Sequence, residues 1–539
     1  MNFHTGFMMS GQDAIIKIKK TDKSFSALVC VLIILVILLG FIVRIYKISA
    51  NPAGLFADEA AIAYNAYTLV TRGTDEFGTS WPFFFRSFGD FRNPVPIYIN
   101  IPSVLLFGLS EFAVRLTAVL CGSLTILILA LVAWQSEVFS KKSPSVYALI
   151  TAVTVALLPW HIHFSRFGSE YIYFPFFLAL GWWLFLKGVK KPVFLLLSSL
   201  AFGVCIYTYY PTWIVTPLFI LILCLIYRRI LVRLPKFAIV AGMIFIISLV
   251  PLATGLKNGI ALTRWQNVTI TKNTRAGLTG KFLTNYLAHF SPRFLFTKGD
   301  IDYPGHFIRR FGSRGAGELY VWMLPFFIIG IIYAVISKTP FGLTLLGLLI
   351  LYPLGSSLAD SDGGAPLAFR SVIGIIPSSL LTALGLAAVT GWLRKQLYKL
   401  LYFAIIAALF TISSISYLYE YHAIYPLYAS DFWGWQFGPR DIMTYFLSHK
   451  SVYDDLYLTP QFNAPQIFLD FYDPRHSCAG VCKVGELDRY DPSRRQLFAV
   501  PSHLLSEISH SYEYQLRQQI FYPDGSGAFT LLEIKSKVL

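Results

Sequence analysis

Apolar runs of about the length of a membrane-spanning helix recur along the whole chain. The hydrocarbon core of a bilayer is ~30 Å thick and a helix rises ~1.5 Å per residue, so a spanning helix needs ~17–25 mainly apolar residues. The two runs on either side of Pro211 are also compatible with one broken hairpin. Taken separately, the runs predict about eleven transmembrane helices, at residues 25–43, 112–134, 144–160, 171–186, 193–209, 211–227, 237–253, 319–336, 341–358, 371–392 and 400–417.

Basic residues gather before the first run and then in every second connection between runs. They lie at 17–23, 141–142, 187–191, 228–236, 338 and 394–399. Positive charge in short loops marks the cytoplasmic side of a membrane. The first run has no small-residue cleavage site, so it predicts a retained anchor with a cytoplasmic N-terminus. The same alternation predicts that five segments lie on the non-cytoplasmic side: residues 44–111, 160–170, 256–318, 359–370 and everything after 417.

The composition excludes a water-soluble globule. Hydrophobic residues make up 55% of the 539 residues and charged residues only 14%, against ~25% in soluble domains. The mean hydropathy is +0.58. A net charge of +16 in such a chain favours the anionic lipids of the plasma membrane over nucleic acid as a partner.

The chain divides by composition into two parts. Residues 1–420 form a membrane module with long outer loops at 44–111 and 256–318, and residues 421–539 form a more polar, extracytoplasmic domain. The first outer loop has helical apolar spacing at 58–72, and the tail has strand-like runs at 455–459 and 466–472. We therefore expect a polytopic α-helical membrane protein with a small soluble α/β domain at its C-terminal end.

Acidic residues are scarce, so those at the membrane boundary are candidates for chemistry. Asp58 and Glu59 open the predicted helix of the first outer loop, where acids also serve as N-terminal caps. Arg92 follows in the same loop, and we expect it near the lipid headgroups on the same face as Asp58. Arg166 and Glu170 stand four residues apart, so both a structural ion pair and a functional pair at a membrane boundary stay open.

The evidence for a functional site is weaker at two histidines and at a second Asp-containing segment. His161 and His163 lie two residues apart, which does not match the i, i+4 spacing of a helical zinc pair, so we expect no metal site there. The turn at 360–364 reads as a polar, Gly-rich loop. Arg370 begins an apolar run, where a guanidinium either binds a lipid phosphate through two hydrogen bonds or simply extends to the interface.

Taken in order, these motifs resemble those of a known family. The chain resembles GT-C glycosyltransferases of the glycosyltransferase 39/83 type, the bacterial relatives of protein O-mannosyltransferases and lipid A aminoarabinose transferases. The resemblance covers most of the membrane region. It rests on Ala57-Asp58-Glu59-Ala60, Arg92-Asn-Pro-Val-Pro-Ile-Tyr98, Gly108-Leu-Ser-Glu-Phe-Ala-Val-Arg-Leu116, Pro159-Trp-His-Ile-His-Phe-Ser-Arg166 with Glu170, and the segment His289 to Asp300.

The resemblance implies an inverting transfer of a sugar from a polyprenyl phosphate to an acceptor hydroxyl on the non-cytoplasmic face, with Asp58 as general base. The aminoarabinose transferases have a Lys-Pro pair where this chain has Asn93-Pro94, and Arg92 is expected to take over the contact with the donor phosphate. The acceptor is a lipid, a glycan or a protein. This chemistry requires no cofactor, and the participation of a divalent metal stays open.

We assign roles on this basis. The catalytic candidates are Asp58, Glu59 and Glu170, of which the two glutamates orient acceptor or sugar. The candidates for binding the donor phosphate are Arg92, Arg166 and Arg370. Further candidates to line the pocket are His161, His163 and Tyr98.

Two other kinds of protein compete with the transferase. A transporter or flippase of lipid-linked sugars would have internal repeats and ionisable groups at mid-membrane, and this sequence has neither feature in view. An inactive relative that binds a partner through its outer domain would not depend on Asp58. Cys478 and Cys482 lie in the predicted outer tail, where both a disulfide and two free thiols are open.

Overall fold

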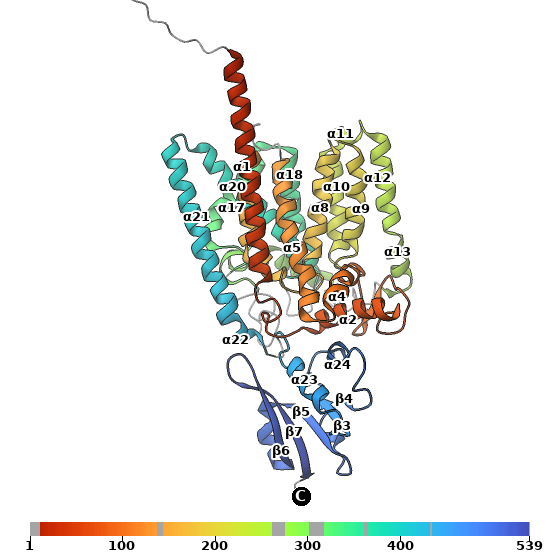
Figure 1. Ribbon diagram of the computed structural model, residues 1–539. Coiled ribbons are helices and arrows are strands. Elements are labelled where there is room, and N and C mark those ends of the chain that lie inside the picture. The colour runs from red at the N-terminus through yellow and green to blue at the C-terminus, as the bar shows by residue number, and fades with distance from the viewer. Residues whose placement is uncertain are drawn as a thin grey trace, which may run out of the picture.

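The computed structural model describes residues 11–136, 144–260, 275–300, 317–359, 365–431 and 434–537, with the backbone alone at 11–26 and 275–276. Figure 1 shows a bundle of long helices with a smaller domain of strands and short helices at one end. Helix α1 (Gly11–Ile45) extends beyond the opposite end of the bundle. The predicted turn at 360–364 and the basic pair at 141–142 lie outside the described residues.

Every predicted apolar run contains a helix. After α1 the bundle helices are α5 (Glu111–Trp134), α6 (Pro144–Leu157), α8 (Tyr173–Gly188), α9 (Val193–Ile206), α10 (Thr212–Ile226), α12 (Pro235–Ser248), α13 (Val250–Lys257), α17 (Leu324–Ser337), α18 (Pro340–Leu351), α19 (Leu354–Ser357), α20 (Ile375–Trp392) and α21 (Gln396–Tyr419).

Six helical segments of the described chain are long and apolar enough to cross a membrane by themselves. They are Ala27–Ile45, Glu111–Trp134, Pro235–Lys257, Pro340–Ser357, Val372–Trp392 and Gln396–Ala429. Several other apolar helices are shorter, so the number of crossings stays a prediction. The polytopic helical membrane fold itself is confirmed, because eleven predicted runs all form helices in one bundle.

The bundle is centred on α20, which is almost entirely buried. Its closest neighbour is α17, and glycines make their approach possible. A Cβ at Gly330 of α17 would lie 1.9 Å from the carbonyl oxygen of Leu381, and a Cβ at Gly385 of α20 would lie 1.9 Å from that of Phe326. Small residues at a crossing let two membrane helices pack backbone against backbone.

Short elements cover the end of the bundle that faces the strand domain (Figure 1). In the first outer loop they are α2 (Ala57–Arg72), β1 (Phe85–Ser87), β2 (Asp90–Arg92), α3 (Val95–Tyr98) and α4 (Ile101–Phe107). Elsewhere they are α7 (Pro159–Phe164), α15 (Arg275–Ala288), the π-helix η2 (Arg293–Lys298), and the 3-10 helices η3 (Val321–Met323) and η4 (Val372–Gly374). At the other end lies α11 (Arg228–Leu231).

The tail forms a mixed sheet flanked by helices. Strands β3 (Asp455–Leu458), β4 (Cys482–Val484), β5 (Gln496–Pro501), β6 (Tyr512–Phe521) and β7 (Gly527–Lys537) stand in the order β4-β3-β5-β7-β6. The first three are parallel to one another, whereas β7 is antiparallel to β5 and β6. The π-helix η5 (Glu420–Ile424) and α22 (Tyr425–Ala429) continue from α21, followed by α23 (Pro439–His449), α24 (Gln466–Tyr472), η6 (Leu487–Arg489), η7 (Ser502–Leu504) and α25 (Leu505–Ser511).

One predicted strand is wrong. The run at 466–472 forms helix α24, while the run at 455–459 contains β3 as predicted. Pro465 stands at the N-cap of α24, and Phe468 and Phe471 three residues apart are buried on one face. An apolar run this short has the same pattern in a buried helix as in a buried strand.

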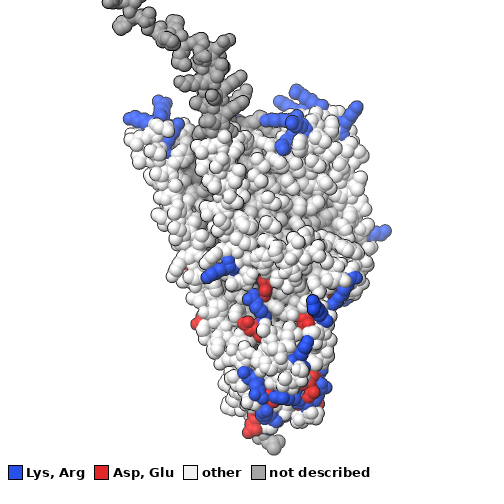
Figure 2. Space-filling view, viewed as in Figure 1, with Lys and Arg blue, Asp and Glu red and all other residues white. Residues whose placement is uncertain are grey.

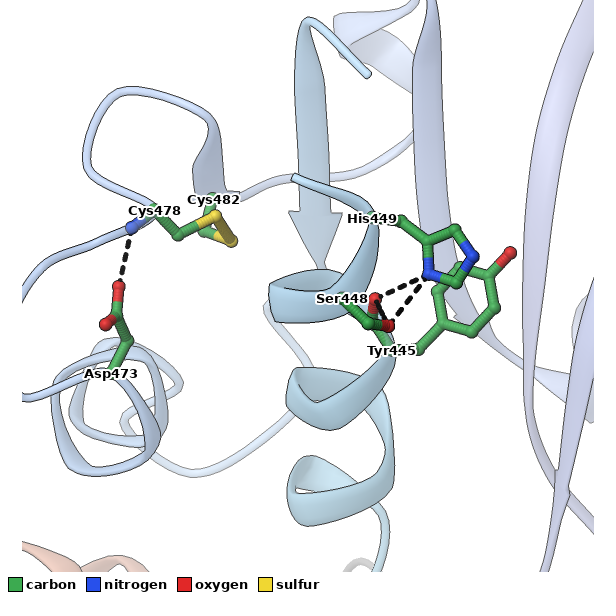
Figure 3. Close-up of a disulfide and its surroundings, with 6 residues drawn as sticks. All are labelled: Tyr445, Ser448, His449, Asp473, Cys478 and Cys482. Carbon is green, nitrogen blue, oxygen red and sulfur yellow. Dashed lines mark hydrogen bonds between the residues drawn. A yellow bond between two sulfur atoms is a disulfide. The ribbon is translucent and has the colours of Figure 1, made fainter. Parts of the chain in front are cut away.

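Cys478 and Cys482 form a disulfide beside this helix (Figure 3). The Asp473 carboxylate accepts a hydrogen bond of 2.7 Å from the Cys478 amide, as the same figure shows.

Charged side chains follow the architecture. Figure 2 shows Lys and Arg at the end of the bundle away from the strand domain, then a broad band without charge on this face, then both signs towards the strand domain. This distribution is that of a protein embedded in a membrane by its apolar band, and the family fold reported below supports an integral membrane protein.

Candidate functional site

Asp58 and Glu59 are neighbours in the first turn of α2, but their side chains lie in different surroundings. Successive residues of a helix point about 100° apart. The Asp58 side chain is 23% exposed, whereas the Glu59 side chain is completely buried. The two acids that the sequence grouped together therefore lie in separate environments.

Glu59 forms a buried ion pair with Arg115 of α5, with distances of 2.9 Å from Nε and 3.0 Å from Nη2. The carboxylate also accepts hydrogen bonds from the amides of Phe56 and Gly168. The remaining N–H groups of the Arg115 guanidinium donate to the carbonyls of Ile48, Pro52 and Gly54.

This pair fixes three separate segments to one another. It joins the connection between α1 and α2, the first turn of α2 and the segment after α7. All four acceptor positions of Glu59 are used inside the protein. We therefore reassign Glu59 from contact with substrate to the positioning of its neighbour Asp58.

Asp58 instead faces Arg92 of strand β2. The distance from Arg92 Nη2 to Asp58 Oδ1 is 2.5 Å, and Arg92 Nη1 lies 3.8 Å from Glu170 Oε2. The Arg92 side chain is 12% exposed and the Glu170 side chain 8%. The structure thus brings together three predicted site residues from α2, β2 and the connection between α7 and α8, and we call them the Asp58–Arg92–Glu170 cluster.

The hairpin of β1 and β2 holds Arg92 in place. Arg92 Nε donates to Ser87 Oγ at 2.8 Å, and the guanidinium lies 5.5 Å from the centre of the Phe88 ring. The Tyr210 hydroxyl donates to the Phe91 carbonyl. The Arg92 head group is therefore directed by side-chain and backbone contacts on both sides of its strand.

Glu76 is a residue of this region that sequence reasoning missed. Its Oε1 accepts a hydrogen bond of 3.0 Å from the Asn65 amide of α2, and its own backbone N–H donates to Asn65 Oδ1 at 3.0 Å. Burial raises the pKa of Glu76 to about 7, while the Asn65 hydrogen bond and the positive charge of Arg92 act in the opposite direction. The sequence contained one indirect signal. Asn65, the hydrogen-bond partner of Glu76, follows Asp58 by seven residues and therefore lies on the same face of the helix, two turns further along.

Arg166 lies elsewhere, and both terminal nitrogens of its guanidinium are used inside the protein. Its guanidinium donates to the carbonyls of Val43, Arg44 and Asn51 and lies 5.3 Å from the centre of the Tyr421 ring. The ion pair with Glu170, one of the two possibilities that their spacing left open, is not found, and Glu170 lies beside Arg92 instead. We reassign Arg166 from phosphate binding to holding the end of α1.

The two histidines belong to the interior. His161 is fully buried, and its Nδ1 lies 2.7 Å from the guanidinium of Arg44. The ring of His163 makes edge contacts with Tyr421 and Trp435, among other aromatic rings. Both residues are therefore packing partners of the α1 and α22 regions, and we withdraw them from the substrate pocket.

Tyr98 and Arg370 stay candidates, although no contact of either with the Asp58–Arg92–Glu170 cluster is seen among the described residues. The Tyr98 hydroxyl donates to the Pro82 carbonyl at 2.8 Å, and its ring stacks on Trp81 with a centroid distance of 6.2 Å. Arg370 is buried over the ring of its neighbour Phe369, which in turn lies 5.2 Å from the ring of Tyr171, the residue after Glu170.

No group of three or more His, Cys, Asp and Glu side chains within the described ranges is arranged to hold a metal ion.

Comparison with known proteins adds to this geometry. Residues 92–253 match the dolichyl-phosphate-mannose-protein mannosyltransferase family. The structure is similar to ArnT from Cupriavidus metallidurans in the apo state, with a TM-score of 0.55 and 13% identity over 94% of this chain and 98% of that one. The chain has the GT-C fold.

Two further structures agree with the GT-C fold. ArnT from Cupriavidus metallidurans bound to undecaprenyl phosphate matches with a TM-score of 0.56 and 13% identity, over 94% of this chain and 98% of that one. The apo oligosaccharyltransferase of Archaeoglobus fulgidus matches with a TM-score of 0.52 and 12% identity, over 93% of this chain and 74% of that one. No curated protein matches the chain by sequence. The GT-C resemblance that the sequence motifs indicated is confirmed.

Proposed function

We propose that the protein is an integral-membrane, inverting glycosyltransferase that moves a sugar from a polyprenyl phosphate to an acceptor hydroxyl. The observation that carries the proposal is the contact of a partly exposed carboxylate, Asp58, with a guanidinium, Arg92. Helix α2, which begins beside Asp58, lies at the end of the helix bundle next to the strand domain (Figure 1). A base for the acceptor hydroxyl and a cation for the departing phosphate are the two elements that this transfer requires, and in the reacting complex the sugar would separate the two side chains.

The bonds change as follows in the proposed reaction. The acceptor oxygen attacks the anomeric carbon of the sugar and passes its proton to Asp58. The bond from that carbon to the phosphate oxygen breaks, and its electron pair leaves with the polyprenyl phosphate. Attack from the face opposite the leaving group inverts the anomeric carbon.

Arg92 is the group that we assign to the phosphate. A guanidinium donates two parallel hydrogen bonds to two oxygens of a phosphate and stays charged throughout. Arg370 is a second candidate for this contact. Glu170 lies 3.8 Å from Arg92, close enough to fix its orientation, and Tyr98 is a further candidate to line the pocket. No step requires a cofactor.

Two relatives support the choice of donor. One similar structure was solved as ArnT bound to undecaprenyl phosphate, and the matching family is named for transfer from dolichyl-phosphate-mannose. Both names describe a polyprenyl phosphate or its sugar conjugate. For the acceptor we retain a lipid, a glycan or a protein hydroxyl.

A transfer assay tests the proposal. Purified protein is incubated with a panel of radiolabelled polyprenyl-phosphate sugars and membrane extracts, and the label is followed into products. We expect Asp58→Asn to lower transfer by ~10²–10⁴-fold, the usual contribution of a general base, with unchanged expression and melting temperature. Asp524→Asn, in the turn between β6 and β7, is the matched control with normal activity.

Two outcomes would contradict the proposal. Full transfer by Asp58→Asn would remove Asp58 from the mechanism. Movement of labelled donor across vesicle membranes without any labelled product would favour the flippase.

The proposed orientation has its own test. We place the N-terminus in the cytoplasm and the active site and strand domain outside it, at the plasma membrane. A C-terminal alkaline phosphatase fusion should be active, because that enzyme folds only where disulfides form. An inactive fusion with normal expression would reverse the orientation.

A further inference from the structure

A groove with a volume of about 580 Å³ lies away from the Asp58–Arg92–Glu170 cluster. It is formed by the end of α21, the beginning of η5, and the segment around η3. The polar and aromatic lining residues that matter are Tyr320, Trp322, Ser413, Ser416, Tyr419 and Glu420. None of them belongs to the proposed catalytic machinery.

The groove opens on the lipid-facing side of the bundle. Ile412 and Tyr419 belong to its lining and are 67% and 65% exposed. Ile415 on the same stretch of α21 is also exposed. Large apolar side chains on the outside of an apolar helix are the surface that contacts acyl chains.

Helix geometry gives the depth of the groove in the membrane. Lys395 and Lys399 stand at the start of α21, where a bilayer surface is expected. About 20 residues of helix cross ~30 Å of hydrocarbon. Counting from Lys399, the opposite boundary falls near Tyr419 and Glu420, so the groove lies at the level of the lipid headgroups.

The lining has the chemistry of a site for a positively charged group. Among the described residues that line the groove, Glu420 alone has a charged side chain. Its Oε1 accepts a hydrogen bond of 3.1 Å from the Tyr428 hydroxyl, and it forms no ion pair with a described cationic side chain. A carboxylate that has no cationic partner among the described side chains attracts a positively charged group.

Aromatic rings line the same groove as this carboxylate. The rings of Tyr320 and Trp322 are nearly parallel, with 12° between their planes and 6.5 Å between their centres. Trp322 Nε1 donates to Ser413 Oγ at 3.0 Å, which fixes the indole. Aromatic faces attract ammonium groups, and cages of such rings recognise them in other proteins.

We propose that this groove binds the ammonium-bearing headgroup of a membrane phospholipid, with the nitrogen beside Glu420 and the aromatic rings and with the acyl chains along α21. A free cation in water would not need the exposed apolar wall, whereas a lipid uses both parts of the groove. The proposal is independent of the glycosyl transfer proposed above.

Native mass spectrometry of the full-length protein tests it. The protein in detergent is mixed with equimolar phosphatidylethanolamine and phosphatidylglycerol of identical acyl chains. We expect ethanolamine lipid to be retained about 2- to 30-fold better, the range that cation–π attraction alone gives. Glu420→Gln, in which the amide oxygen can still accept from Tyr428, should remove most of this preference.

A second variant and a control separate binding from folding. Tyr419→Leu removes one ring without removing any hydrogen bond of the groove, and should weaken the preference several-fold. Glu507→Gln, in the exposed helix α25, should leave it unchanged. Equal retention of the two lipids by the wild type, or an undiminished preference in a folded Glu420→Gln variant, would overturn the proposal.

Discussion

Replacement of Glu59 by glutamine should strongly destabilise the protein, although the change removes only one charge. The glutamine oxygen can still accept from Arg115 Nε and Gly168 N–H, which both contact Oε1. Its NH₂ group would face Arg115 Nη2 and Phe56 N–H, which contact Oε2. These two buried N–H groups would then face another hydrogen-bond donor and would have no acceptor.

The magnitude follows from these contacts. Each buried donor without an acceptor costs ~1–3 kcal/mol, so two of them cost ~2–6 kcal/mol. The loss of one member of a buried ion pair typically costs ~3–5 kcal/mol, which falls within that range. At ~1.4 kcal/mol for each factor of ten, a loss of ~4 kcal/mol raises the unfolding constant by about 10³-fold.

Thermal stability in detergent measures this effect. Samples are heated, and the remaining monodisperse fraction is measured by size exclusion with tryptophan fluorescence. Glu59→Gln should lose its native peak at a clearly lower temperature than the wild type. Glu507→Gln, in the exposed helix α25, is the matched control, because it also removes one carboxylate charge but breaks no buried contact. Equal melting of Glu59→Gln and wild type would refute the structural role of the buried pair.

Three further substitutions have defined outcomes. Gly54→Ala places a methyl group 2.0 Å from the Trp435 carbonyl oxygen, so the yield of folded protein should fall in a size-exclusion assay. The pKa of Glu76 is raised from 4.5 to about 7, so the folded state binds this proton more tightly than the unfolded state. The free energy of unfolding should therefore decrease as the pH rises from about 4.5 to 7. In Glu76→Gln this part of the pH dependence of the melting temperature should disappear. Replacing Cys478 and Cys482 by serine opens a five-residue loop and should cost ~2 kcal/mol by loop entropy, measured by urea unfolding of the strand domain.

The helical part of the fold was predictable because its cause is local. A run of apolar residues long enough to cross a bilayer has no alternative to helix, since each backbone N–H must be satisfied within the segment. The run at 466–472 was misread because it lies in the soluble domain, where that constraint is absent and seven residues fit either element.

The candidate site was predictable in part. The placement of Arg92 on the same side as Asp58 followed from the helical pattern, and the structure has the two in contact. The partner of Glu59 was not predictable, because Arg115 lies 56 residues away on another helix. Arg166, like Arg92, is an arginine near a predicted membrane boundary, yet its hydrogen bonds go to backbone carbonyls. Every residue has such a carbonyl, so these partners cannot be recognised from the sequence.

The glycine contacts between α17 and α20 have a mechanical consequence. Each helix has a backbone carbonyl where the other would have its Cβ, so neither can turn about its axis without a collision. Side chains separate the backbones at most helix crossings, whereas at this crossing the backbones are in direct contact. If helices of the bundle move apart so that a long lipid chain can enter from the membrane, α17 and α20 will move as one unit. The opening will then form between other helices.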